Sequence, residues 1–162
     1  MKFKGITKVH EGRFITAYNA EYETEAGNKK IYELVSRDKN ITSLEDLKRA
    51  KCDAVVLIIT STDGEKILIS KEYRMAVGGF AYNFPAGLID EGEDPEEAAE
   101  RELWEETGLK LVSIEEVLPM SFSGVGVTNE KSCCVIGKAE GEFALAHLMR
   151  KRSKRVGTPR KK

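Results

Sequence analysis

A short acidic segment with clear start and stop signals is the feature that most constrains the fold of this chain. Asp94 is a good helix N-cap, Pro95 suits the first helical position, and Glu97 completes a capping pattern three residues after the cap. Gly108 is the glycine expected just after the last helical turn. These signals predict a helix over residues 95–107. The face expected to pack on a sheet carries Ala99, Leu103 and Thr107.

Strand-like segments lie on both sides of this helix in the sequence. Residues 1–36 alternate apolar and polar side chains in three short runs, which predicts a small N-terminal antiparallel sheet. Ser43 begins a predicted helical turn over 43–50. Residues 54–60 are continuously apolar and rich in β-branched side chains, as in a strand buried on both faces. The further strands are predicted over residues 66–74, 111–122 and 132–141, with a loop opening at Gly78.

Seven carboxylates crowd residues 94–106. A charge run of this kind usually marks a solvated helix face. Here Glu102, Glu105 and Glu106 stand at i, i+3 and i+4, so they project from one face and repel one another. A divalent cation would reverse the sign of that interaction, since hard cations such as Mg²⁺ bind carboxylate oxygens. Arg101, four residues after Glu97 and four before Glu105, can hold the carboxylates in position.

The same stretch resembles the Nudix box. The matching residues are Gly87-x5-Glu93-x7-Arg101-Glu102-Leu103-x-Glu105-Glu106-x-Gly108-Leu109. Blocks outside the box are similar to the ADP-ribose pyrophosphatase branch of that family, and the resemblance covers roughly residues 30–140. These blocks are Tyr32-Glu33 with Arg37, Lys71-Glu72-Tyr73-Arg74, and Phe84-Pro85-Ala86-Gly87.

This resemblance implies an α/β/α sandwich around a mixed sheet. It also implies hydrolysis of a nucleoside diphosphate linked to another group, with Mg²⁺ or Mn²⁺ as cofactor. By the resemblance, Glu102 and Glu106 would bind metal together with the backbone carbonyl of Ala86. Glu105 would bind metal or polarise water, and Glu93 would brace the loop or the helix. Such cations would neutralise charge on the phosphoryl oxygens.

Residues expected on the substrate side come from several segments. Arg74 and Arg37 are candidates for phosphate or ribose contacts, although a lone arginine reads equally well as part of a surface salt bridge. In the ADP-ribose branch the N-terminal strands exchange with a partner subunit, and Glu33 and Arg37 would then line the partner's adenosine pocket. Glu130 matches an acid that follows the box in that branch. The sequence therefore predicts a homodimer that binds a nucleoside diphosphate-linked small molecule.

The sequence also departs from the branch. Glu72 stands where a glutamine is usual, and Asn83 stands where a glutamate is usual. No acidic residue follows Glu142, although several family members carry a proposed general base there, so an incomplete or atypical C-terminus is expected.

The net charge of −1 is a cancellation between two parts of the chain. Residues 150–162 contain eight basic residues and no acidic one, and the rest of the chain carries −9. This tail is open to three interpretations: an idle disordered segment, an aberrant terminus, or a nucleic-acid-binding arm. No aromatic interleaving supports the last, so no nucleic-acid partner is expected.

The predicted organisation has three parts: N-terminal, dimerising strands over 1–42, a Nudix hydrolase domain over 43–149, and a disordered basic tail over 150–162. The start of the chain lacks the apolar centre of a signal peptide, and no apolar stretch is long enough to span a membrane. Three cysteines do not make a disulfide framework and are expected to be free thiols. A soluble, cytoplasmic protein without a membrane partner is expected.

Three functions remain open on the sequence alone. The first is a hydrolase that splits the pyrophosphate of ADP-ribose or a related nucleotide sugar into AMP and a sugar phosphate. The second is a nucleotide-binding protein with little catalysis, because C-terminal elements of the family are missing. The third is a Nudix enzyme acting on nucleoside triphosphates or dinucleoside polyphosphates, since the box handles phosphates and not the nucleoside.

Overall fold

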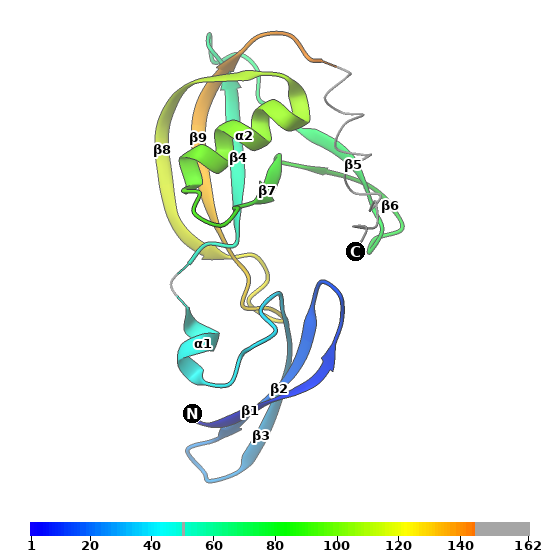
Figure 1. The fold of residues 1–162 in the computed structure, drawn as a ribbon, viewed down its shortest axis with the longest axis vertical. Coiled ribbons are helices and arrows are strands. Elements are labelled where there is room, and N and C mark those ends of the chain that lie inside the picture. The colour runs from blue at the N-terminus through cyan, green and yellow to red at the C-terminus, as the bar shows by residue number, and fades with distance from the viewer. Residues whose placement is uncertain (50, 145–162) are drawn as a thin grey trace, which may run out of the picture. The chain divides into compact units, whose positions relative to one another are not determined.

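The computed structural model describes residues 1–49 and 51–144 (Figure 1). The chain forms two compact units. The first comprises Met1–Cys52 and Ser121–Ser132, and the second comprises Asp53–Met120 and the described residues from Cys133 onward. The first unit thus includes residues 43–52 and 121–132, which were predicted to belong to the second domain (43–149).

The first unit is built on a three-stranded antiparallel sheet in the order β1-β2-β3. Its strands are β1 (Lys2–Glu11), β2 (Thr16–Glu23) and β3 (Lys29–Ser36), as the alternating pattern predicted. Helix α1 (Leu44–Lys48) follows, with a capping box between Ser43 and Asp46. The small core of this unit consists of Tyr18, Ala20, Leu34 and Ile41.

The glycine-rich segment 123–130 lies against the edge of β3 in the first unit. The Val35 N–H donates to the Val127 carbonyl over 2.9 Å, and the Tyr32 hydroxyl donates to the Gly126 carbonyl over 2.6 Å. These bonds hold the segment alongside the strand that carries Glu33.

The second unit contains a four-stranded sheet in the order β7-β4-β9-β8 and a separate two-stranded hairpin, β5-β6. Strands β4 and β7 are antiparallel, with Val56 opposite Ala86. The strands are β4 (Ala54–Ser61), β5 (Ser70–Arg74), β6 (Gly79–Asn83), β7 (Ala86–Leu88), β8 (Lys110–Phe122) and β9 (Lys131–Glu140).

Helix α2 (Pro95–Thr107) lies across the four-stranded sheet (Figure 1). Asp94 accepts from the N–H groups of Glu96 and Glu97, and Gly108 ends the helix in a left-handed conformation with φ 76°, so both predicted boundaries are confirmed. The predicted packing face is buried as well. The core between helix and sheet consists of Val55, Leu57, Ile59, Ala98, Ala99, Leu103, Val135 and Ala139.

The mixed α/β class predicted from the sequence is confirmed, but two local predictions are wrong. Residues 66–74 do not form one strand: β5 starts at Ser70, and Ile67 makes only an isolated bridge to Thr60. The loop predicted from Gly78 is a tight turn into β6, because the N–H groups of Val77 and Gly78 both donate to the Arg74 carbonyl. The basic tail 150–162 lies outside the described residues entirely.

The expectation of three free thiols is wrong for two cysteines. Cys52 and Cys133 are disulfide-bonded, and Cys134 is free, with the pKa of its thiol raised by burial. The spacing of cysteines along a chain gives no distance in the fold, so the sequence does not show which thiols are oxidised. Among the described residues, no helix is long and apolar enough to cross a membrane.

The capping box of α2 generates a stability prediction. Asp94→Ala removes the acceptor for two backbone N–H groups, so it should lower the free energy of unfolding by about 1 kcal/mol. Asp94→Asn keeps a side-chain oxygen at the cap and should retain most of the stability. Urea unfolding followed by circular dichroism measures both. Equal losses in the two variants would contradict the capping role.

Candidate active site

The carboxylates singled out in the sequence lie on the second half of α2. Glu102 is buried, with a relative exposure of 6%, whereas Glu105 and Glu106 are half-buried. A glutamate is rarely buried unless its charge is paired. The contacts of Glu102 therefore show which groups compensate its buried charge.

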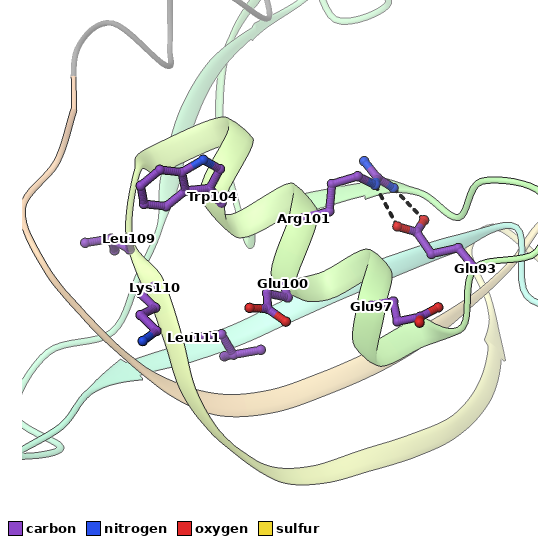
Figure 2. Close-up of a pocket in the computed structure, with 8 residues that line it drawn as sticks. All are labelled: Glu93, Glu97, Glu100, Arg101, Trp104, Leu109, Lys110 and Leu111. Carbon is purple, nitrogen blue, oxygen red and sulfur yellow. Dashed lines mark hydrogen bonds and ion pairs between the residues drawn. The ribbon is translucent and has the colours of Figure 1, made fainter.

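Arg101 joins the helix to the loop before it and to strand β7. Its guanidinium binds both carboxylate oxygens of Glu93, Nε to Oε1 and Nη2 to Oε2, each over 2.7 Å (Figure 2). Nη1 donates to Glu102 Oε1 over 2.9 Å, and Nη2 also donates to the Leu88 carbonyl over 2.9 Å. A planar guanidinium forked onto a carboxylate gives geometric precision as well as attraction.

The partners of Arg101 only partly match the sequence prediction. Arg101 was expected to act between Glu97 and Glu105, each four residues away. Glu97 instead accepts the Asp94 N–H over 3.1 Å as part of the capping box. Glu93, eight residues before Arg101, accepts two of the four bonds that Arg101 donates, which fits the bracing role that the resemblance implied for Glu93.

Gly87 provides the space into which the Glu102 carboxylate fits. A Cβ atom at residue 87 would lie 2.0 Å from Glu102 Cδ and 2.2 Å from Oε1, so a larger residue would displace the carboxylate. Strand β7 therefore carries the glycine of the motif because a side chain from α2 lies against its backbone. Ala86, the residue whose carbonyl was predicted to bind metal, directly precedes this contact.

Electrostatic attraction between Glu93 and Arg101 keeps both side chains charged. The Arg101 guanidinium, aided by the Asp90 N–H, lowers the pKa of Glu93 from its ordinary 4.5 to about 2. The pKa of Arg101 is raised, chiefly by its bonds to Glu93 and then by those to Glu102. Glu93 is therefore anionic at neutral pH and serves as a fixed anchor rather than a proton donor.

The donors near Ala86 suit a hard divalent cation in kind. Carboxylate and carbonyl oxygens are what such ions bind, and the Gly87 space holds one carboxylate against the strand. Within residues 1–49 and 51–144, no three His, Cys, Asp or Glu side chains converge as a ready metal cluster. Glu102, Glu105 and Glu106 thus share a helix segment without forming a preassembled three-ligand site.

The residues predicted on the substrate side are distributed over both units. Arg74, in the second unit, pairs with Glu72 over 3.1 Å, which is the surface salt bridge that a lone arginine allowed. In the first unit, Arg37 Nε pairs with Glu130 Oε2 over 2.6 Å, and Glu33 lies on β3. The structure therefore brings together Arg37 with Glu130, and Glu93 with Arg101 and Glu102.

A pocket of about 430 Å³ lies beside α2 and was not predicted from the sequence. Glu97, Glu100, Arg101 and Trp104 recur at helical spacing on one face, and this is the signal that could have indicated a shared surface. The lining residues are Glu93, Glu97, Glu100, Arg101, Trp104, Leu109, Lys110 and Leu111 (Figure 2).

Comparison with known proteins decides the family. Residues 50–153 match the NUDIX domain. The chain belongs to the NUDIX domain family. Nudix hydrolases generally need divalent metal ions, which agrees with the oxygen donors around Gly87.

Two curated relatives are similar to this Nudix chain over part of their length. An ADP-sugar pyrophosphatase of Mus musculus is 33% identical over 103 residues, which are 63% of this chain and 45% of the mouse protein. An ADP-ribose pyrophosphatase of Saccharomyces cerevisiae is 42% identical over 85 residues, which are 50% of this chain and 36% of the yeast protein. The chain thus spans less than half the length of either relative.

A solved structure described as an ADP compounds hydrolase shares the fold. It superposes with a TM-score of 0.69, covering 94% of this chain and 84% of the other, at 22% sequence identity. This likeness confirms that the Nudix motif is carried on the expected type of fold.

The Glu93–Arg101 pair predicts a pH-dependent stability. Because folding lowers the pKa of Glu93, the stabilisation is complete above about pH 4.5 and is lost as the pH falls towards 2. Glu93→Gln should cost roughly 1.5–3 kcal/mol at pH 7 and much less at pH 2.5. Urea unfolding at both pH values measures the difference. Glu91→Gln, at an exposed neighbouring position, is the control, and an equal effect of Glu93→Gln at both pH values would contradict the prediction.

Proposed function

We propose that this chain hydrolyses the pyrophosphate bond of ADP-ribose or a related nucleoside diphosphate sugar, giving AMP and a sugar phosphate. The observation that carries the proposal is the buried Glu102 carboxylate, held by Arg101 against Gly87, the residue that follows Ala86 in β7. The printed names of the mouse and yeast relatives support the substrate class.

The proposed metal roles are those that the resemblance to the Nudix box implies. Glu102, Glu106 and the Ala86 carbonyl would hold a divalent cation, Mg²⁺ or Mn²⁺, and Glu105 would bind metal or accept a proton from the attacking water. When bound, the cation would offset the negative charge of the pyrophosphate and make water a better nucleophile. Arg101, anchored by Glu93, would act as a positioning residue for Glu102.

The chemistry requires that water be the nucleophile at one phosphorus atom. A new P–O bond forms from the water oxygen, the bridging P–O bond breaks, and the bridging oxygen leaves with the other phosphate. The proton given up by water would pass to Glu105 or to solvent. A bound cation would stabilise the carboxylates of α2, because without it they would repel both one another and the substrate.

We also propose substrate contacts and a dimer. Arg74 would contact phosphate or ribose after leaving the exposed Glu72, a weak surface pair that is easily exchanged. Arg37 would face the nucleoside together with Glu33, and Glu130 would hold Arg37 in place through their 2.6 Å contact. Pairing of the N-terminal strands between two copies would form a homodimer.

The metal role of Glu106 is tested by Glu106→Gln, which keeps the size of the side chain and removes its charge. Turnover of ADP-ribose with Mg²⁺ should fall by at least about a hundredfold, on the order of 3 kcal/mol in transition-state stabilisation. The urea midpoint should stay close to that of the original protein. Glu96→Gln, in the first turn of the same helix, is the matched control. Unchanged turnover in Glu106→Gln would refute the assignment.

Gly87→Ala tests whether activity requires the position of the Glu102 carboxylate against β7. The added methyl would lie 2.0 Å from Glu102 Cδ, so the carboxylate must move and turnover should fall at least about tenfold. Gly5→Ala is the matched control, because a Cβ at residue 5 meets nothing within 4 Å. Full activity in Gly87→Ala would show that the position of Glu102 against β7 is not required.

A further inference from the structure

The pocket beside α2 is largely separate from the groups proposed for catalysis. We refer to this cavity of about 430 Å³, whose eight lining residues are drawn in Figure 2, as the outer pocket. Only Glu93 and Arg101 among them also belong to the candidate active site. The other residues that α2 contributes, Glu97, Glu100 and Trp104, lie on its exposed side. The outer pocket can therefore hold a partner other than the substrate.

The outer pocket is apolar towards the end of α2. Leu109 and Leu111 are partly buried and pack against the core of the second unit. Trp104 lines the pocket with them and is 51% exposed. A large ring that stays half in solvent next to two leucines offers apolar surface to a partner.

The outer pocket is acidic towards the start of α2. Glu97 accepts one backbone N–H, that of Asp94, and a carboxylate has the capacity to accept more. In the part of the chain that the structure describes, no cation pairs with the Glu100 carboxylate, although Lys110 lines the same pocket. Two carboxylates within about two helical turns of a tryptophan suit a cationic partner. An arginine or lysine can pair with the carboxylates and also lie over the ring.

The last described residues of the chain lead to the apolar end of the outer pocket. The Ala144 N–H donates to the Thr107 carbonyl, in the last turn of α2, over 3.0 Å. Gly141 lies against Leu109, because a Cβ at residue 141 would be 3.9 Å from Leu109 Cδ2. Both contacts are made within the second unit. Residue 145 therefore continues the chain from a point next to the pocket.

The residues that follow Ala144 match the outer pocket in the order of their chemistry. Residues 145–149 include two leucines and a methionine, and residues 150–155 include five basic side chains and no acidic one. The pocket likewise changes from apolar at Trp104 to acidic at Glu97, which is about 10 Å away along the helix. The extended backbone of residues 145–150 spans at most about 20 Å, so the first basic residues can reach the glutamates.

We propose that the outer pocket binds residues 145–152 of the same chain. The leucines and the methionine of this segment cover Trp104, and its three basic residues pair with Glu97 and Glu100. Because the segment is tethered next to the pocket, its effective concentration is on the order of millimolar, which favours it over a second copy of the chain. The inference goes beyond the proposed hydrolysis and does not require it. It gives the start of the basic tail a role in covering the exposed side of α2.

Trp104 is the single tryptophan of the chain, so quenching of its fluorescence by acrylamide measures access to the outer pocket in the intact protein. Arg150→Glu/Lys151→Glu/Arg152→Glu reverses the charges that would face the two glutamates. The docked fraction should fall and the quenching constant should rise about twofold, because exposed ion pairs of modest strength hold the segment. Acrylamide is uncharged, so the substitutions do not change its local concentration.

The matched control for the tail is Arg160→Glu/Lys161→Glu/Lys162→Glu. It makes the same change in charge outside the proposed segment and should leave the quenching of Trp104 unchanged. Urea unfolding followed by circular dichroism verifies that each variant is folded.

A charge exchange tests the pairing from the side of the helix. Glu100→Lys should raise the quenching constant as the tail variant does, and combining it with Lys151→Glu should bring the constant back towards that of the original chain. Glu96→Lys is the matched control, because Glu96 is exposed on the same helix but does not line the outer pocket. It should leave the quenching unchanged.

Three results would overturn the proposal. The first is an unchanged quenching constant in the variant of residues 150–152. The second is an equal rise in Glu96→Lys and Glu100→Lys, with no recovery in the charge exchange. The third is protection of Trp104 that disappears on dilution of the protein, which would assign the outer pocket to the tail of a second copy.

Discussion

The guanidinium of Arg101 is the contact on which the rest of the candidate site depends. It binds the Glu93 carboxylate through two bonds, Glu102 through one, and the Leu88 carbonyl through another. One side chain thus fixes the loop before α2, the helix itself and strand β7 relative to one another. The Glu102 carboxylate can be buried because this pairing compensates the loss of hydration.

The sequence motif and the fold explain each other at this contact. Gly87 is needed because Glu102 occupies the space that a Cβ would take, and Glu93 is needed because Arg101 requires an anchor on the loop. The apolar side of α2 packs on the sheet, so the helix cannot turn these groups away from β7. The residues of the motif, which look like a charge pattern in the sequence, are therefore required by packing and ion pairing in the fold.

Local signals were sufficient for the elements that have them. Helix α2 was predicted from the caps at Asp94 and Gly108, and α1 from the cap at Ser43. The N-terminal sheet was predicted from the alternation of apolar and polar side chains in residues 1–36. Strand β7 was missed because three residues carry no periodicity, and β6 because glycines at its start read as a loop. The long-range partners Glu102 and Gly87 cannot be paired from spacing alone, since only the fold brings them together.

The arrangement around Arg101 is proposed to serve cleavage of a nucleotide pyrophosphate bond. The most direct measurement is incubation of the full chain with ADP-ribose and Mg²⁺, with the products identified by chromatography and mass spectrometry. We expect AMP and ribose 5-phosphate in equal amounts, with the reaction abolished by a chelator and restored by added Mg²⁺. Recovery of intact ADP-ribose, or release of ADP and free ribose, would contradict it.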